Sequence, residues 1–203
     1  MHTLYDYLPS GNGYKVRLTL SLLKQPFKFV DLDIMKGATR TESFLQKNPN
    51  GRIPTLEYAP GEFLFESNAI LHYLAQDTDL LPDSRLHRAQ VLQWLFFEQY
   101  SHEPFIAVSR FILMHGEPDA ASKKRLESKR KGGLAALKLM DEHLSQHDYF
   151  VNNTFSIADI GLYAYTHVAD EGGFDLGAYP AVTSWLQRVA SRPGHCLITD
   201  TFA

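Results

Sequence analysis

Cysteine is nearly absent from this chain of 203 residues, in which Cys196 stands alone. A single cysteine cannot close a disulfide within the chain, and without a Cys-x-x-Cys motif any thiol chemistry must use the thiol of another molecule. The apolar runs are far shorter than the roughly 20 residues that a membrane-spanning helix needs. The first residues lack the basic and apolar segments of a signal peptide, so we expect a cytoplasmic protein.

An excess of positive charge is also missing. Twenty Lys and Arg residues against 23 Asp and Glu give a formal net charge of −3, which supplies no general attraction to nucleic acid or to an anionic membrane. We therefore expect neither as a partner. The basic run at residues 123–131 is interpreted as a solvated helix face, with anion binding as the alternative. Hydrophobic residues make up 44% of the chain, which is typical of a globular protein with an ordinary core.

The chain changes character near residue 80. Residues 3–76 alternate extended and helical runs in the order strand, helix, strand, helix, strand, strand, helix, which predicts an α/β domain. The segment at residues 59–62 is too short for a parallel crossover, so the last two strands should form an antiparallel hairpin. Beyond residue 86 almost everything has helical periodicity. We therefore predict an α/β domain at residues 1–78, a linker at 79–86 and an all-helical domain at 87–203.

The helical region contains recognisable starts and breaks. A long helix from about residue 87 to 114 should be interrupted at Pro104, which lacks a backbone donor. Further helices are expected at about 119–147 and 180–190. Ser156 and Asp159 have the spacing of a capping box, which predicts that another helix begins there.

The turn at residues 10–16 lies between the first strand and the first helix. Its Gly11 and Gly13 resemble the start of a dinucleotide-binding fingerprint, but Val16 replaces the third glycine and a hairpin follows where further parallel crossovers would be needed. The spacing of a Walker loop is absent as well. What remains is a helix N-terminus, which favours a negative charge, with the Ser10 hydroxyl beside it. Ser10 could instead be only a turn or cap residue.

Two further segments carry groups that could bind a ligand. Ile53 precedes Pro54 at the start of a predicted strand, and a cis bond there would leave the backbone of Ile53 open to a ligand. Glu66 and Ser67 lie at the next predicted helix start, where Ser67 is expected to be the cap. A helix N-terminus that attracts a carboxylate and a carboxylate that attracts an ammonium together suggest a site for an amino acid zwitterion.

A metal site is not predicted. His143 and His147 have the i, i+4 spacing of helical metal ligands, but no third ligand is evident in the sequence. We interpret both as exposed residues near the C-terminal end of a helix, where an imidazole is favourable.

Four segments in this order and spacing resemble the soluble bacterial glutathione transferases over essentially the whole chain: residues 10–17, residues 48–54, residues 66–70 and the capping box at 156–159. The resemblance implies a thioredoxin-like domain followed by an all-helical domain, usually in a homodimer. It also implies glutathione as the cosubstrate. Ser10 stands where other classes have tyrosine or cysteine, which indicates the serine type.

The resemblance assigns roles to individual residues. Ser10 looks like the hydroxyl that hydrogen-bonds the glutathione sulfur, with Asn12 as a second or competing donor. The backbone of Ile53, before a cis Pro54, should pair with the cysteinyl part. Glu66 and Ser67 should hold the γ-glutamyl ammonium and carboxylate. Arg52 is a candidate for the glycyl carboxylate, with Lys47, Arg40 and Thr39 as alternatives close by in the sequence.

The electrophile is expected to bind between the first domain and the interrupted helix. Candidate residues on that helix are Tyr100, His102, Phe105, Arg110 and Phe111. Conjugation of glutathione to a small, largely apolar electrophile is the first functional interpretation, and detoxification is the role it implies. The alternatives are glutathione-dependent reduction of disulfides without a protein cysteine, and a binding protein that has lost turnover.

Overall fold

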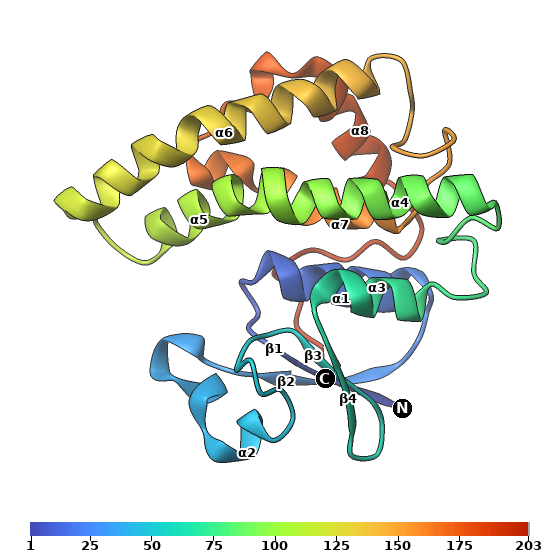
Figure 1. The fold of residues 1–203 in the computed structure, drawn as a ribbon, viewed down its shortest axis with the longest axis vertical. Helices are drawn as coiled ribbons and strands as arrows, with labels where there is room; N and C mark the ends of the chain where they lie inside the picture. The colour runs from blue at the N-terminus through green and yellow to red at the C-terminus, as the bar shows by residue number, and fades with distance from the viewer. Residues whose placement is uncertain (203) are drawn as a thin grey trace. The chain divides into compact units, whose positions relative to one another are not determined.

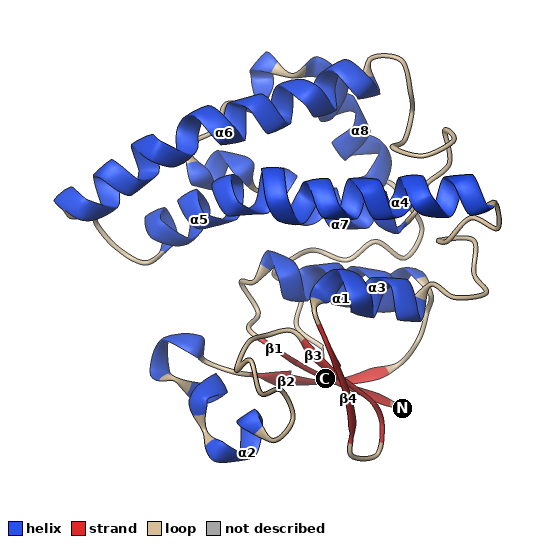
Figure 2. Cartoon of the chain, viewed as in Figure 1, coloured by secondary structure: helices blue, strands red, loops and turns tan. Residues whose placement is uncertain are grey.

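The computed structural model describes residues 1–202 and divides them into two compact units, one formed by residues 1–78 with 193–202 and the other by residues 79–192. Ala203, the last residue of the predicted helical domain, lies outside the described residues. All strands of the sheet belong to the first unit, and the second is built from helices (Figure 2). No described helix combines the length and apolar character that crossing a membrane requires.

The first unit contains a four-stranded sheet with the strand order β2-β1-β3-β4. Strand β1 pairs in parallel with β2, and the β1–β3 and β3–β4 pairs are antiparallel, so the predicted hairpin is confirmed. The predicted order of elements and the α/β class are confirmed too. The strands are β1 (His2–Asp6), β2 (Phe27–Asp31), β3 (Thr55–Ala59) and β4 (Glu62–Phe65).

The helices of this unit cover the sheet. Helices α1 (Gly11–Leu22) and α3 (Ser67–Leu74) lie side by side on one face, and the short α2 (Glu42–Leu45) lies away from them (Figure 1). Helix α1 is buried continuously from Gly13 to Leu20, so its charged residues are buried along with its apolar ones.

A buried ion pair joins the middle of α1 to the end of β1. The Arg17 Nε lies 3.1 Å from Asp6 Oδ2, and both side chains are fully buried. Arg17 also donates to the carbonyl oxygens of Leu8 at 2.6 Å and Ile198 at 2.8 Å. Desolvation raises the pKa of Asp6 to about 7, an effect that the charge of Arg17 only partly offsets. The guanidinium thus connects the strand, the turn that follows it and the C-terminal segment.

The C-terminal segment, residues 193–202, packs on the first unit rather than on the helices that precede it. Tyr14 donates its hydroxyl proton to the carbonyl of Cys196 at 2.7 Å, and Ser21 donates to the carbonyl of Gly194, also at 2.7 Å. The boundary of 87–203 predicted from sequence is therefore wrong at its C-terminal end. These contacts join residues more than 170 positions apart, which periodicity within one segment cannot reveal.

The second unit is a bundle of five α-helices and short 3-10 and π turns. Helix α7 is buried over all ten of its residues and forms the core of the bundle. The predicted linker is partly wrong, because α4 already begins within it and Leu80 and Leu81 are buried. The helices are α4 (Arg85–Phe97), α5 (Glu103–Met114), α6 (Ala120–Leu144), α7 (Ile157–Thr166) and α8 (Pro180–Ala190).

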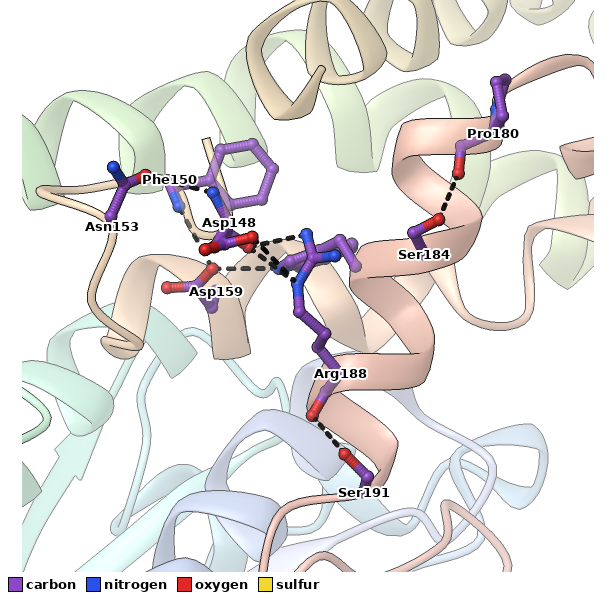
Figure 3. Close-up of polar contacts among 9 residues, drawn as sticks. Asp148, Phe150, Asn153, Asp159, Pro180, Ser184, Arg188 and Ser191 are labelled. Carbon is purple, nitrogen blue, oxygen red and sulfur yellow. Dashed lines mark hydrogen bonds and ion pairs between the residues drawn. The ribbon is translucent and has the colours of Figure 1, made fainter. Parts of the chain in front are cut away.

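The predicted capping box at the start of α7 is confirmed. Asp159 accepts a hydrogen bond from the backbone N–H of Ser156 at 2.9 Å, and the Ser156 hydroxyl accepts one from Ala158. The other Asp159 oxygen accepts from Trp185 Nε1 at 3.0 Å and from the N–H of Phe150. Figure 3 shows this carboxylate beside the loop that carries Phe150. One buried acid therefore joins α7, α8 and the loop between α6 and α7.

The interruption of the long helix lies just before Pro104. Residues Glu98–His102 form a π-helical turn between α4 and α5. Pro104 follows it as the second residue of α5, where a helix does not need the backbone donor that proline lacks. The predicted interruption next to Pro104 is confirmed, since Pro104 cannot donate to the carbonyl of Tyr100 four residues earlier and that residue lies within the π turn.

Gly13 should tolerate no side chain. A Cβ atom at this position would fall on the carboxylate of Asp6, which is held in place by Arg17. We expect Gly13→Ala to lower the free energy of unfolding by about 3 kcal/mol, measured by urea denaturation, because it overpacks the core and disturbs a buried ion pair. Gly61→Ala is the control, since it adds a Cβ in open space at φ 76° and should cost about 1 kcal/mol. An equal loss of unfolding free energy in the two variants would show that the Asp6 carboxylate moves aside to make room for the new Cβ.

Cys196 should be unreactive in the native protein. Burial raises the pKa of its thiol to about 11. At pH 7.5 the thiolate fraction is then about 300-fold lower than that of a free thiol with a pKa near 8.5. We expect an aromatic disulfide reagent to label Cys196 at least that much more slowly in the native protein than in urea. Comparable rates in the two states would contradict the buried position of the thiol.

Candidate functional site

The register of the sheet brings three predicted segments to one edge. Tyr5 pairs with Thr55, and Thr55 pairs with Phe65. The turn after β1, the residues before β3 and the residues after β4 therefore meet at the same end of these three strands. These segments contain Ser10 and Asn12, Ile53 and Pro54, and Glu66 and Ser67, which the sequence had placed in one site.

Ser10 is the N-cap of α1. Its hydroxyl oxygen accepts a hydrogen bond from the N–H of Gly13 at 3.2 Å, and its carbonyl accepts from Tyr14 at 2.9 Å. Accepting this bond leaves the hydroxyl proton of Ser10 available, because a hydroxyl is one donor and two acceptors. The cap role and the role of donor to a ligand are therefore compatible.

Asn12 and Ser67 connect the two helix starts directly. The Ser67 hydroxyl donates to Asn12 Oδ1 at 3.2 Å across the gap between α1 and α3. With this oxygen engaged, the other end of the Asn12 amide carries N–H donors. The site therefore combines a hydroxyl from Ser10 and an amide from Asn12 within one turn.

The start of α3 differs from the prediction. Glu66, not Ser67, occupies the N-cap position, and its side chain makes no capping hydrogen bond. Its backbone has φ 68°, a left-handed conformation that non-glycine residues seldom adopt and that is often found at functional sites. Ser67 is the first helical residue, and its hydroxyl is directed to α1 instead of to its own helix. Glu66 remains exposed while Ser67 is buried.

The segment before β3 has the predicted backbone geometry. The Ile53–Pro54 peptide bond is cis. The carbonyl of Arg52 accepts bonds from Asn48 Nδ2 at 2.8 Å and from Thr55 Oγ1 at 3.1 Å, which ties the turn to β3. The Arg52 side chain is exposed.

The alternatives to Arg52 have structural contacts in the first unit. Arg40 donates to the carbonyl of Asn50 at 3.2 Å. The Lys47 ammonium lies over the rings of Tyr5 and Phe63, at 5.4 and 4.9 Å from their centroids. Thr39 is buried.

The electrostatics of this edge favour an anion. Helices α1 and α3 both begin here, and each N-terminus carries a partial positive charge. Lys15 adds a buried ammonium, whose Nζ lies 3.4 Å from both Ser67 Oγ and Asn68 Oδ1. Exposed Glu66 is the carboxylate that could bind a cationic group of the same ligand.

The five residues predicted to contact an electrophile all lie in the second unit, but they differ in how far they are exposed. His102 is fully buried, with its Nε2 2.9 Å from Thr166 Oγ1. Arg110 is buried in an ion pair with Glu171 at 2.6 Å. Phe105 is half-buried against Gly132, whereas Tyr100 and Phe111 are exposed. His102 and Arg110 therefore serve the packing of this unit, and the remaining three carry accessible ring surface.

Sequence reasoning did not identify Lys15 and Arg17 as parts of the site. Both lie in α1, and both are fully buried. The sequence does contain one signal for their burial: Lys15 and Arg17 are the two charged residues in a helix that otherwise contains uncharged residues. Their partners Ser67 and Ile198 lie 52 and 181 residues away, so the sequence could not name them.

Metal ligands do not cluster within residues 1–202: no three His, Cys, Asp or Glu side chains come together there. His143 and His147 stack on one another, with ring centroids 4.3 Å apart. His143 also stacks on Phe150, and burial lowers the pKa of His143. It is half-buried, not exposed as predicted, and belongs to an aromatic cluster with Trp94.

The basic run of α6 also has structural contacts. Lys129 lies over the ring of Phe105, and Arg130 donates to the carbonyl of Gly173 at 3.2 Å. The other basic residues of the run, Lys123, Lys124, Arg125 and Lys131, are exposed as predicted for a solvated helix face.

Comparison with known proteins places both units in one family. The glutathione S-transferase N-terminal domain model matches residues 2–76, and the corresponding C-terminal domain model matches residues 92–193. The crystal structure of a glutathione S-transferase from Pseudomonas fluorescens Pf-5 is 50% identical with a TM-score of 0.96, and the match covers 98% of this chain and 99% of that one.

Two further relatives agree with this assignment. The structure of a glutathione S-transferase from Xanthobacter autotrophicus Py2 is 41% identical with a TM-score of 0.93, covering 98% of this chain and 97% of that one. The disulfide-bond oxidoreductase YfcG of Escherichia coli K12 is 30% identical over 198 residues, 92% of this chain and 89% of its own. With its thioredoxin-like first unit, its helical second unit and these matches over most of its length, the chain belongs to the glutathione S-transferase family.

Proposed function

We propose that this protein is a glutathione transferase of the serine type, which activates the thiol of glutathione for attack on a small electrophile. The observation that carries the proposal is the meeting of two helix N-termini at one edge of the sheet, with Ser10, Asn12 and Ser67 supplying hydrogen-bonding groups and Glu66 a carboxylate. Glutathione has carboxylates, an ammonium and a thiol, and this edge offers a matching group for each.

In the proposed complex, glutathione lies along this edge of the sheet. Ser67 at the α3 N-terminus holds the γ-glutamyl carboxylate, and Glu66 holds the ammonium beside it. The backbone of Ile53, next to the cis Pro54, pairs with the cysteinyl part. Exposed Arg52 is the candidate for the glycyl carboxylate. This arrangement directs the sulfur toward Ser10 and Asn12.

Ser10 and Asn12 act by stabilising a thiolate. A free thiol with a pKa near 8.5 is about 3% ionised at pH 7, and lowering that pKa by two units requires roughly 2.7 kcal/mol and raises the fraction to about 75%. A charge-assisted hydrogen bond contributes about 1.5–3 kcal/mol and a helix N-terminus about 0.3–1 kcal/mol. One hydroxyl at the start of α1 is therefore sufficient in magnitude. Cys196, buried and with a raised pKa, leaves the thiol to be supplied by the substrate.

The conjugation step forms one bond and breaks another. The thiolate sulfur attacks an electrophilic carbon, and the electron pair of the broken bond leaves with the departing group, for example a halide. Tyr100, Phe105 and Phe111 remain candidates to contact the apolar body of the electrophile, because their rings are exposed or half-buried. A cytoplasmic location stays a prediction from the sequence.

Reduction of disulfides is the second candidate, favoured by the similarity to YfcG, which is a disulfide-bond oxidoreductase. Here the thiolate would attack a disulfide sulfur and release one thiolate, and a second glutathione would then resolve the mixed disulfide. No protein cysteine takes part in either reaction. Parallel assays with an aryl halide and with a small disulfide separate the two activities.

Ser10→Ala should raise the pKa of bound glutathione. We expect the thiolate absorbance of glutathione, followed in the ultraviolet across pH, to titrate well below pH 8.5 with the wild-type protein and one to two pH units higher with the variant, because one charge-assisted hydrogen bond is lost. Turnover at pH 7 should fall about tenfold, with glutathione affinity changed less than threefold.

Matched variants show whether Ser10 or Asn12 donates the hydrogen bond to the glutathione sulfur. Ser43→Ala, at an exposed serine of α2, should behave as the wild type. A normal titration in Ser10→Ala with a shifted one in Asn12→Ala would transfer the role to Asn12. Binding of glutathione without ionisation in the wild type would indicate a binding protein without turnover, and no binding would refute the proposal.

We also propose that the protein acts as a homodimer, as the family resemblance implies. Leu92 and Phe96 are spaced four residues apart along α4, with 39% and 70% of their surfaces exposed. Such a pair of exposed apolar and aromatic side chains is typical of a protein interface.

Phe96→Glu should therefore yield a monomer. A charge in the centre of an apolar interface is left without solvation or a partner, so we expect the molar mass from light scattering after gel filtration to halve. Leu139→Glu, at a 45% exposed leucine of α6, is the control and should leave the mass unchanged. A wild-type protein that elutes with the mass of one chain would overturn the dimer proposal.

A further inference from the structure

Lys15 is a buried cation directly behind the proposed carboxylate site. It lies in the second turn of α1, and none of its surface is exposed. Its Nζ lies 3.4 Å from Ser67 Oγ and 3.4 Å from Asn68 Oδ1, both at the start of α3. Burial of an ammonium is costly unless oxygen atoms surround it, and these contacts are oxygens of the helix that the proposed ligand meets.

The hydrogen bonds around Lys15 have a defined direction. An ammonium group is only a donor, so Ser67 Oγ accepts from Lys15. Ser67 in turn directs its own proton to Asn12 Oδ1 at 3.2 Å. The chain of bonds therefore runs from Lys15 through Ser67 to Asn12, and each donor along it is polarised by the charge at its start. It links the residue proposed to hold the γ-glutamyl carboxylate with the second candidate donor to the sulfur.

We infer that Lys15 is a positioning and specificity residue, whose charge acts through Ser67 to select ligands that carry the α-carboxylate of a γ-glutamyl group. This inference rests on the proposed glutathione site. A carboxylate oxygen that accepts the Ser67 hydroxyl proton at about 2.7 Å, in place of Asn12 Oδ1, would lie within roughly 6 Å of the ammonium, because Ser67 Oγ is 3.4 Å from Lys15 Nζ. At such a distance inside a protein, an opposite unit charge changes affinity by at least about tenfold.

A purely structural role for Lys15 makes a different prediction. If the side chain only joins α1 to α3, its loss should weaken all ligands of the site alike. If its charge recognises the carboxylate, the loss should weaken only ligands that carry this group. Glutathione and 4-aminobutanoyl-cysteinyl-glycine, which differ by the α-carboxylate alone, distinguish the two roles.

The test is a calorimetric measurement of Kd for these two peptides with wild type, Lys15→Gln and Lys15→Arg. Glutamine can still form hydrogen bonds with Ser67 and Asn68 but has no charge, whereas arginine keeps the charge. We expect the wild type to favour glutathione at least tenfold. Lys15→Gln should lose about tenfold of that preference through weaker glutathione binding, with the shorter peptide unaffected, and Lys15→Arg should retain most of it.

A third peptide and a second lysine serve as controls. Glutaryl-cysteinyl-glycine has the carboxylate but no ammonium, so it should lose affinity for Lys15→Gln as glutathione does. Lys28→Gln, at an exposed lysine of β2, should leave every ratio unchanged.

Three outcomes would overturn the inference: an unchanged preference in Lys15→Gln, an equal loss for both peptides, or failure of both Lys15 variants to fold, which would assign the lysine to structure alone. In each of these cases glutathione binding by the wild type would leave the proposed function intact. Absence of glutathione binding by the wild type would remove the proposed function itself, and the inference with it.

Discussion

The buried ion pair of Arg17 and Asp6 determines the path of the chain from the first strand into the first helix. Breaking such a pair on one side costs about 3–5 kcal/mol, whereas replacing both partners by apolar residues is often neutral. Its consequence for this protein is therefore orientation more than stability. Arg17 binds the Asp6 carboxylate and the carbonyl oxygens of Leu8 and Ile198, so one side chain places the end of β1, the turn before Ser10 and the C-terminal segment together. Gly13 lets Asp6 approach the helix backbone, because it has no Cβ.

The geometry of the candidate site follows from this arrangement. The turn that the ion pair positions ends at Ser10, and the sheet register sets the starts of β3 and α3 beside it. Two helix N-termini and Lys15 then concentrate positive potential at one place, while the hydroxyls of Ser10 and Ser67 supply short-range hydrogen bonds. This combination suits a small peptide with two carboxylates and a thiol. In the proposed function, this edge activates the thiol of glutathione, so that no reactive cysteine of the chain itself is required.

The second unit depends on a different buried acid. Asp159 closes the start of α7, accepts a hydrogen bond from Trp185 of α8 and holds the loop that carries Phe150. Burial raises the pKa of Asp159 to about 6 even though it accepts several hydrogen bonds, which indicates how completely it is enclosed. The first unit contains the polar edge, and the second exposes Leu92 and Phe96 of α4. The thiol activation proposed for the first unit and the self-association proposed for α4 are thus built on separate structural cores.

Local patterns in the sequence were sufficient for the strands, the hairpin and the capping box, because turns, caps and periodicity depend on neighbours within a few positions. They also indicated the turn of Ser10 and the helix start of Glu66, whose roles toward a ligand stay predictions. They were misleading where a distant contact decided the outcome. Ser67 binds Asn12 and Lys15 instead of capping α3, and residues 193–202 pack on the first unit. The sequence by itself determined the fold class and which residue types gather at the site. Only the tertiary structure decided that Lys15 and Arg17 are buried there, because their partners are separated from them by 52 and 181 residues and meet them only after the sheet and helices have packed.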